Sequence, residues 1–312
     1  MGKVFDPRDH RLANGCEEFA QSPQALVFDD FIRVYFSSRQ RDAGGKYLSH
    51  VCYADFSKDF SAVLGVNQAP VIPLGKLGCF DQHGIFPMNV VRHAGKILGY
   101  TSGWTRRVSV SVDTGIGLAT SEDCGRTFAR AFDGPILAAS LHEPFLVGDP
   151  FVLPADGILH MWYIFGVRWT RFSADAAPDR VYKIGHATSL DGVRWTKEEA
   201  RQIVADSLHG DESQALPTVA RIGSRYHMFF CYRESADFRT GSGRGYRLGH
   251  ACSDDLANWT RDDEAGGMAM QGDGWDSQMM CYPHLFECGG RIHLLYNGND
   301  FGRHGFGLAI LE

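Results

Sequence analysis

The sequence predicts an all-β fold, a five-bladed β-propeller built from four-stranded antiparallel blades. An apolar segment containing a proline recurs along the 312 residues, and similar β-rich segments follow each copy. The recurring prolines are Pro23, Pro87, Pro150, Pro217 and Pro283, with successive spacings of 64, 63, 67 and 66 residues. A regular period of this length is typical of repeat architectures. Four strands in each of five units describe a propeller, whose blades surround a central channel.

Each unit begins with its proline segment as the first strand. A turn containing Asp or Gly follows, and then a second run rich in β-branched and aromatic residues. These second strands are expected at 31–39, 95–103, 158–166, 225–233 and 291–299. Third strands are expected at 46–54, 115–121, 183–189, 247–253 and 305–311.

Polar turns lead into the fourth strands. They are SEDCGRTF at 121–128, SLDGVRWT at 189–196 and SDDLANWT at 253–260. Asp and Gly supply the turn geometry, and the aromatic residue is expected to pack back on its blade. These turns resemble the Asp-box of sialidase propellers. We expect a structural role for them, because hairpin turns of this chemistry need no ligand.

The repeat favours a single domain over residues 1–312. Its blades are expected at about 17–75, 80–138, 142–205, 209–270 and 275–312, the last one completed by residues 1–6. The final unit ends at its third strand, GFGLAILE. We therefore expect the N-terminal GKVFDP to supply the missing outer strand, so that no free edge remains between the first and last blades.

Composition limits the classes of partner. The 44% hydrophobic content allows a large core, while the net charge of -6 and the pI near 6.1 argue against nucleic acid. The sequence has no apolar run that could span a membrane and no secretory h-region at its start, so a cytoplasmic location is expected. Its eight cysteines form no CxxC pair and are expected to be reduced structural thiols. The oligomeric state stays open.

Carboxylates recur on one rim of the predicted channel. In an antiparallel blade, the start of the first strand and the end of the second lie on the same face. Acids at or just before the first strands are Glu17, Glu18, Asp81, Glu143, Asp149, Asp211, Glu212 and Asp276. The segment WDSQMMCYPHLF at 275–286 is accordingly expected to be a first strand, with Asp276 at its entrance.

Arginines occupy the other half of this rim. In each blade, arginines lie at or after the end of the second strand. They are Arg39, Arg41, Arg106, Arg107, Arg168, Arg171, Arg233, Arg239 and Arg303. The planar guanidinium suits carboxylate, phosphate or sulfate, so the pattern favours an anionic ligand. The alternative is that these arginines pair with the rim acids or are solvated.

Aromatic and histidine side chains near the rim add candidates for ligand contacts. Trp104, Trp169 and Tyr296 could stack on a sugar ring, although each is more often a packing residue. His83 and His284 lie on first strands and could bind a substrate, coordinate a divalent cation in the channel or be satisfied in the core. Their spacing matches no recognised ligand pattern, so no cofactor and no metal are expected, with a channel cation as the alternative.

The motifs GDPF at 148–151, DGVRWT at 191–196 and YNGN at 296–299 resemble those of the five-bladed glycoside hydrolase superfamily. This superfamily includes families 43 and 32 and the family 130 mannoside phosphorylases, and the resemblance extends over the whole chain. Within it, the chain looks closest to uncharacterised propeller proteins of bacterial surface-polysaccharide gene clusters, which share phrases like YNGNDFG. The resemblance implies a carbohydrate substrate, a role in polysaccharide biosynthesis and a substrate contact for Asn297.

The family-43 pattern uses an Asp base, a Glu acid and a second Asp that tunes the acid. The resemblance implies that Asp149 is the tuning residue and Glu212 the acid. Ser22 stands where the family has its base, so the base would be Glu18, Asp81 or Asp276, or would be absent. A phosphorylase needs only one protein carboxylic acid, because phosphate is the nucleophile.

These observations lead to an expected function. The chain is expected to cleave a glycosidic bond with inversion, by hydrolysis or phosphorolysis, on an acidic or phosphorylated glycan or sugar. Arg106, Arg107 and Arg233 would clamp the anion, and Arg168 would assist on the same rim. One alternative is a non-catalytic glycan-binding propeller. Another is a propeller enzyme that catalyses elimination or group transfer on a sugar-like anionic substrate.

Overall fold

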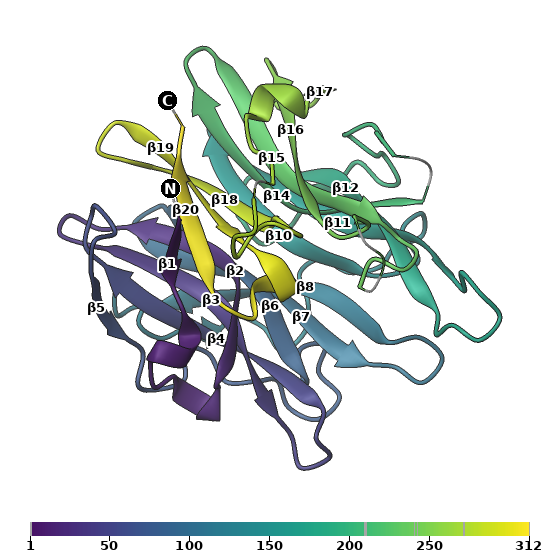
Figure 1. The fold of residues 1–312 in the computed structure, drawn as a ribbon, viewed down its shortest axis with the longest axis horizontal. Helices are drawn as coiled ribbons and strands as arrows, with labels where there is room; N and C mark the ends of the chain where they lie inside the picture. Colours follow the sequence, from purple (N-terminus) through teal and green to yellow (C-terminus); the bar gives the residue numbers. More distant parts are fainter. Residues whose placement is uncertain (1, 209–210, 240, 242, 271, 312) are drawn as a thin grey trace.

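The computed structural model describes residues 2–208, 211–239, 241, 243–270 and 272–311, and this part of the chain is nearly all β (Figure 1). The helices of the described residues are single turns: η1 (Pro7–Asp9), η2 (Ala13–Gly15), η3 (Glu264–Gly266) and α1 (Asn299–Gly302). None of these helices is long and apolar enough to cross a membrane.

The first half of the chain forms an eight-stranded sheet that consists of two antiparallel groups. One group holds β2 (Glu18–Val27), β3 (Ile32–Arg41), β4 (Tyr47–Phe56) and β5 (Val63–Val66). The other holds β6 (Gly84–His93), β7 (Lys96–Arg106), β8 (Val112–Ser121) and β9 (Ala129–Arg130). A parallel pairing of Ser49 in β4 with Gly84 in β6 joins the two groups.

Three four-stranded antiparallel sheets follow. The first contains β10 (Val147–Ala155), β11 (Ile158–Thr170), β12 (Asp179–Ser189) and β13 (Thr196–Lys197). The second contains β14 (Glu212–Ile222), β15 (Arg225–Glu234), β16 (Arg247–Ser253) and β17 (Thr260–Arg261). The last contains β18 (Cys281–Cys288), β19 (Arg291–Asn297), β20 (Phe306–Ile310) and β1 (Lys3–Phe5). The expected second and third strands are thereby confirmed.

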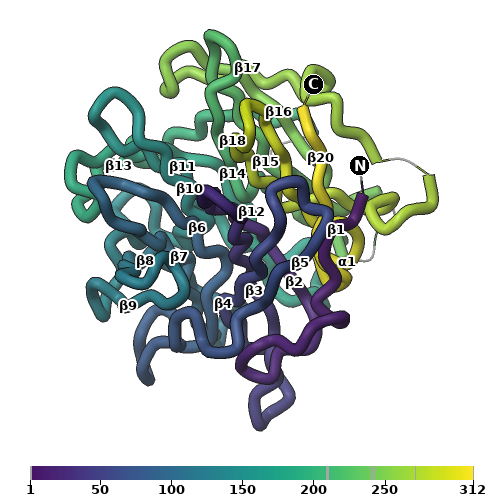
Figure 2. Tube along the Cα trace, turned by 90° about the vertical axis from the view of Figure 1, so that its left-hand side faces the viewer, coloured from purple at the N-terminus to yellow at the C-terminus, as the bar shows by residue number. Residues whose placement is uncertain are grey.

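The N-terminal strand completes the last sheet, as the sequence predicts. Lys3 pairs with Gly307 and Phe5 with Phe306, in antiparallel orientation. Figures 1 and 2 show β1 directly beside β20, with both chain ends at this place. Met1 lies outside the described residues.

The first strands of successive groups contact one another around the molecule. β2 contacts β6, β6 contacts β10, β10 contacts β14, β14 contacts β18, and β18 returns to β2. Buried apolar residues fill the spaces between neighbouring groups. Phe5, Phe36 and Phe306 lie between the last and the first group, whereas Trp162 and Phe230 lie between the third and the fourth. The core is therefore a series of inter-sheet layers, which holds the first strands side by side.

The recurring prolines mark β-bulges in the first strands. The pairing register shifts at the proline in each of β2, β6, β10, β14 and β18. Proline has no N–H for the ladder and disfavours the right-handed helical conformation in the residue before it. That residue has a positive φ at Ser22, Asp149, Leu216 and Tyr282. The bulge re-aims the side chain that precedes the proline, which is a common use of bulges near active sites.

The polar turns hold themselves together, in agreement with their expected structural role. The Asp191 carboxylate accepts hydrogen bonds from the amides of Val193 and Arg194, both at 2.8 Å. Asp255 does the same for Ala257 and Asn258. The Trp195 and Trp259 indoles each donate back to a turn carbonyl, at 3.2 and 3.0 Å.

The segment WDSQMMCYPHLF contains its strand only in its second part. β18 begins at Cys281, and residues 275–280 precede it outside regular structure. Asp276 accepts a hydrogen bond from the Tyr296 hydroxyl at 2.8 Å, and Trp275 packs on the same tyrosine ring. Asp276 is therefore tied to the neighbouring strand.

Candidate active site

A cavity of about 600 Å³ opens at the end of the sheets where the first strands begin and the second strands end. This is the rim that the topology predicts for function. The lining residues on first strands are Phe19, Gln21, Phe86, Gly148, Asp149 and Tyr282. Second strands contribute Arg39, Ser102, Trp104, Ile164 and Arg233. Third strands contribute Tyr47, Ser49, Val112, Thr114, Arg180 and Tyr182.

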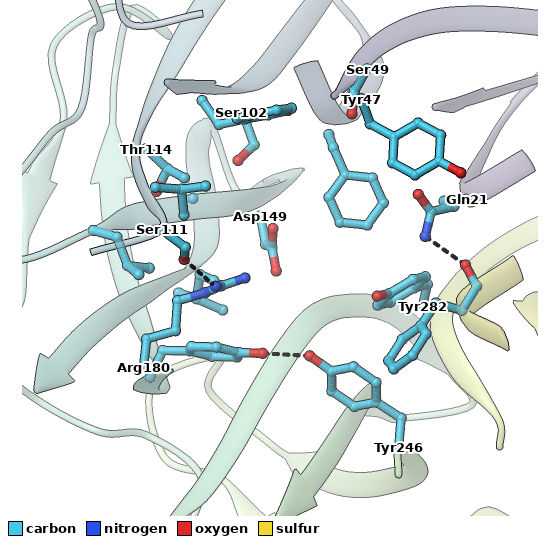
Figure 3. A pocket seen from close by; sticks show the side chains of 18 of the residues that line it. Gln21, Tyr47, Ser49, Ser102, Ser111, Thr114, Asp149, Arg180, Tyr246 and Tyr282 are labelled. Atoms are coloured by element: carbon cyan, nitrogen blue, oxygen red, sulfur yellow. Dashed lines mark hydrogen bonds between the residues drawn. The ribbon is translucent and has the colours of Figure 1, made fainter. Parts of the chain in front are cut away.

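Asp149 is the carboxylate of the cavity: no other Asp or Glu among the described residues lines it. It sits at the bulge of β10 with φ 52°, and only 8% of its surface is exposed. Burial raises the pKa of Asp149 to about 7, although nearby Arg180 and the Leu216 amide act in the opposite direction. Figure 3 shows Asp149 in the middle of the cavity, with Arg180 beside it. The side chain can therefore hold a proton near neutral pH.

Arg180 and Arg239 form one cationic side of the cavity. Both contact the Asp179 carboxylate, at 3.8 and 2.9 Å respectively. Arg180 also reaches the Ser111 hydroxyl at 3.4 Å. Since two guanidinium groups share one carboxylate, this side keeps a net positive charge.

Arg233 is the deeply buried cation of the site, with 1% of its surface exposed. Its guanidinium donates to the Tyr182 hydroxyl at 3.0 Å and to the Glu234 carbonyl at 2.8 Å. It also lies 3.4 Å from the centre of the Phe238 ring. Its Nε–H has no hydrogen-bond partner among the described residues. Arg233 thus carries a positive charge that no carboxylate of the described residues contacts directly.

Arg39 lines the cavity next to Gln21. Its Nε donates to the Gln21 amide oxygen at 2.8 Å, and its guanidinium lies over the rings of Phe19 and Tyr47. No ion pair involves Arg39 within the described chain. Burial lowers the pKa of Arg39, an effect that Tyr282 and Tyr47 partly offset. An incoming anion would relieve this desolvated charge.

Aromatic side chains form much of the remaining wall. They are Phe19, Tyr47, Phe86, Trp104, Tyr182, Phe238, Tyr246, Tyr282 and Phe301. The Tyr182 and Tyr246 hydroxyls hydrogen-bond to each other. Flat apolar faces with a few polar groups between them suit the ring of a sugar, which has apolar faces and a polar edge.

Glu212 does not face this cavity. It is fully buried, and its carboxylate accepts from Arg261 at 2.6 Å, from Gln214 at 2.9 Å and from the Leu208 amide at 2.9 Å. Burial alone would raise the pKa of Glu212, but the hydrogen bonds from Gln214, Leu208 and Arg261 lower it. A carboxylate held ionised in this way is unsuited to be the acid.

The other expected acids also lie outside the cavity. Asp81 is buried against Arg130, whose Nε donates to it at 2.8 Å. Glu18 pairs with Arg303 at 2.9 Å. The expectation that Asp149, Glu212 and either Asp81 or Asp276 share one cavity is therefore wrong. The sequence predicts which end of a strand an acid occupies, but not which side of the strand it faces.

Several expected arginines are paired away from the cavity. Arg106 contacts Asp42 at 2.7 Å and the Tyr47 carbonyl at 2.7 Å. Arg107 pairs with Asp113, and Arg168 with Asp211. For these three the pairing alternative holds, whereas Arg39 and Arg233 line the cavity as expected.

Trp104 lines the cavity, but His83, His284 and Asn297 do not. His83 packs on the Trp104 ring and accepts from the Arg106 amide at 3.3 Å. His284 is buried beside Phe151, and burial lowers its pKa to about 4. Asn297 is buried as well: it accepts from the Ser22 amide and donates to two backbone carbonyls, those of Ala20 and Gly305, all at 2.8 Å. Its hydrogen bonds link β19 to β2.

Sequence reasoning missed Gln21, Arg180, Tyr182, Tyr246 and Tyr282 as cavity residues. An internal repeat could have indicated two of them, because YKIGH at 182–186 and YRLGH at 246–250 share a pattern at the start of their third strands. Tyr282 stands directly before a recurring proline, as Asp149 does.

Comparison with solved structures places this architecture among the glycoside hydrolase propellers. The BT0996 RGII complex superposes with a TM-score of 0.74 at 16% identity, over all of this chain and 90% of that protein. A sucrose-6-phosphate hydrolase from Lactobacillus gasseri gives 0.65 at 13% identity, over all of this chain and 61% of the other. A thermostable family-43 glycoside hydrolase gives 0.64 at 13%, over 94% and 89%. The chain thus has the fold of the family-43 glycoside hydrolase propellers.

Two sequence relatives define the family more narrowly. They are the uncharacterised proteins MT1551 and Rv1502 from two strains of Mycobacterium tuberculosis, each 32% identical over 321 aligned positions. The alignments cover all of this chain and 98% of each relative. The chain belongs to the family of these two proteins. No protein-family model matches it.

Proposed function

We propose that the protein cleaves a glycosidic bond by inverting phosphorolysis, with Asp149 as the acid and with an acidic or phosphorylated glycan or sugar as substrate. The observation that carries this proposal is the cavity's single described carboxylate, which burial keeps protonatable near pH 7 among four arginines. A general acid works best when its pKa lies near the working pH.

The count of carboxylates favours phosphate over water as the nucleophile. Inverting hydrolysis needs a second carboxylate, roughly 6.5–9.5 Å from the first, to activate water. No second carboxylate among the described residues lines the cavity. Phosphate is already nucleophilic and needs cationic groups to hold it, which Arg180 and Arg233 supply.

The proposed step balances with these groups alone. A phosphate oxygen attacks the anomeric carbon from the face opposite the glycosidic oxygen. The bond from the anomeric carbon to that oxygen breaks, and its electron pair takes the proton of Asp149. The products are a sugar 1-phosphate of inverted configuration and the freed alcohol. Asp149 regains its proton from solvent.

Arg39 provides the reason to propose an anionic sugar. It lines the cavity without an acidic partner among the described residues, and its planar fork suits a carboxylate or a phosphate on the substrate. A sucrose-6-phosphate hydrolase among the structural neighbours supports a phosphorylated sugar by analogy. A role in polysaccharide biosynthesis and a cytoplasmic location complete the proposal.

The second candidate is a glycan-binding propeller without catalysis. The same single carboxylate favours it, because binding needs no acid and base pair. Replacing Asp149 by Asn separates the two candidates, since it would abolish cleavage in an enzyme but leave most of the affinity of a binding protein.

We also propose that the sheets form a closed ring of five blades in one domain. The closed sequence of contacts among the first strands and the core clusters between neighbouring groups support this count. The parallel pairing of Ser49 with Gly84 is then a contact between two blades.

Phosphate binding provides the first test. Calorimetry should show binding of inorganic phosphate to the wild type and an affinity at least tenfold lower for Arg180→Lys, which keeps the charge but loses the fork. Arg106→Lys is the matched control, because Arg106 pairs with Asp42 outside the cavity. The phosphate affinity of this variant should equal that of the wild type. A wild type that binds no phosphate, or equal weakening in both variants, would contradict the proposal.

A further inference from the structure

A group of two histidines and one cysteine lies on a sheet far from the cavity. His227 is on β15, and His250 and Cys252 are on the neighbouring strand β16. It is the group of three potential metal ligands found among the described residues. His227 lies near the opposite end of β15 from Arg233, roughly 20 Å along the strand at about 3.3 Å per residue. The cluster is therefore separate from the candidate active site.

The spacing of the three ligand atoms fits a tetrahedral metal. The distance from His227 Nδ1 to His250 Nε2 is 3.0 Å, and Cys252 Sγ lies 3.5 Å from the first and 3.7 Å from the second. With metal bonds of about 2.05 Å to nitrogen and about 2.3 Å to sulfur, a tetrahedral zinc ion separates two nitrogens by about 3.4 Å and nitrogen from sulfur by about 3.6 Å. Shifts of a few tenths of an ångström would bring all three atoms into position.

The surroundings of His250 prepare its nitrogen for a metal. His250 Nδ1 lies 2.9 Å from the Asp262 carbonyl oxygen, which can only accept a hydrogen bond. The proton of the neutral ring is therefore on Nδ1, and Nε2 presents its lone pair to His227 and Cys252. A backbone carbonyl that orients a histidine in this way is the usual outer support of a metal ligand.

The preceding sheet supplies an internal comparison. His160 on β11 and His186 on β12 repeat the histidine pair, with Nδ1 to Nε2 at 3.1 Å. His160 pairs in register with Thr188, as His227 does with Cys252. The two sheets therefore differ at the residue paired with the first histidine, which is Thr188 in one sheet and Cys252 in the other. A hydrogen bond between the two rings is enough to account for a histidine pair. The Cys252 thiol adds a third ligand, of a kind that zinc prefers.

We propose that His227, His250 and Cys252 bind one zinc ion, with water in the fourth position. Each of the two partly exposed residues, His227 and Cys252, gives the ion access from solvent. Zinc favours imidazole and thiolate together, and the thiol loses its proton when the ion binds. The site lies on the two middle strands of its sheet, and it is independent of the proposed cleavage reaction.

Cobalt(II) is the probe, because it replaces zinc and gives a thiolate-to-metal absorption band. Purified wild-type protein, freed of metal by dialysis against a chelator, should take up one equivalent of Co²⁺ with this band, and Zn²⁺ should remove the band. Cys252→Thr, which copies the residue at Thr188, should lose the band and bind Zn²⁺ at least tenfold more weakly. Cys124→Ser, which changes an exposed thiol elsewhere, is the control. It should keep the cobalt band and the Zn²⁺ affinity of the wild type.

A second variant guards against misfolding as an explanation. His227→Asn should also lose the band, and circular dichroism without metal should match the wild type for both variants. A wild type without the band, or a band that survives Cys252→Thr, would overturn the proposal. So would a Zn²⁺ affinity that neither Cys252→Thr nor His227→Asn reduces.

Discussion

At the scale of single residues, the position of Asp149 relative to its proline explains its chemistry. Asp149 directly precedes Pro150, where the bulge turns the preceding side chain out of the regular alternation. The equivalent residues in the other first strands are Ser22, Phe86, Leu216 and Tyr282. Aligning the repeats on their prolines therefore singles out Asp149 as the only acid at this position. Glu212 lies farther from its proline and faces Arg261 instead.

Asp149 should make the stability of the protein depend on pH in a specific direction. Its pKa is about 7 in the folded protein and 3.8 as the ordinary value. Below pH 3.8 Asp149 is protonated in both the folded and the unfolded state, so it does not change the free energy of unfolding with pH. Between pH 4 and 7 only the folded state keeps it, so the free energy of unfolding should fall as pH rises, by on the order of 4 kcal/mol in total.

Asp149→Asn removes this titration. Relative to the wild type, the variant should therefore gain stability between pH 4 and 7 and then keep a constant difference. Urea unfolding of both proteins at several pH values measures this difference in the free energy of unfolding. Because the other carboxylates are the same in both proteins, their contributions cancel when one free energy is subtracted from the other. A difference that does not change with pH would show that Asp149 titrates normally.

At the scale of elements, Asn297 fastens the last sheet to the first. Its amide makes three hydrogen bonds in a fully buried place, to Ser22, Ala20 and Gly305. Asn297→Ala would leave the Ser22 amide and two carbonyls without partners, and each buried unsatisfied group costs about 1–3 kcal/mol. We expect a loss of roughly 3 kcal/mol in the free energy of unfolding.

Asn258→Ala is the matched comparison, since the Asn258 amide bonds to Asp255 at the surface. Asn258→Ala should lower the free energy of unfolding, measured with urea, by less than about 1 kcal/mol. Equal losses in the two variants would contradict the role of Asn297 as a link between sheets.

The sequence predicted the strands well because their pattern is local. Proline spacing and β-rich runs place the second and third strands correctly, and the unpaired third strand at the C-terminus predicts the pairing of β1 with β20. The side-chain partners were less predictable. Whether an arginine faces the cavity, as Arg39 in β3 does, or pairs with an acid, as Arg106 in β7 does, depends on the side of the strand it occupies and on the partners it meets there, which no spacing encodes.

At the scale of the whole molecule, β1 joins the two ends of the chain through Phe5. This ring is 3% exposed and stacks on Phe306 and His10 while contacting Phe36 and Phe56. Phe5→Ala should reduce the free energy of unfolding by about 3–5 kcal/mol, as for other buried phenylalanines. Thermal unfolding measures the effect. Val108→Ala, at a fully exposed side chain, is the control and should change little. A Phe5→Ala protein as stable as the control would show that β1 does not hold the last sheet.

The central claim is that the cavity joins one protonatable carboxylate to an anion site for phosphate-dependent cleavage. ³¹P NMR tests it most directly, because it detects a sugar 1-phosphate whatever the sugar. The wild type would be incubated with phosphate and a panel of neutral, uronic-acid and phosphorylated oligosaccharides, and Asp149→Asn would be the comparison. We expect a sugar 1-phosphate signal with the wild type only, strongest for an anionic member of the panel. Release of free reducing sugar by the wild type without phosphate, or an equal signal from Asp149→Asn, would contradict the claim.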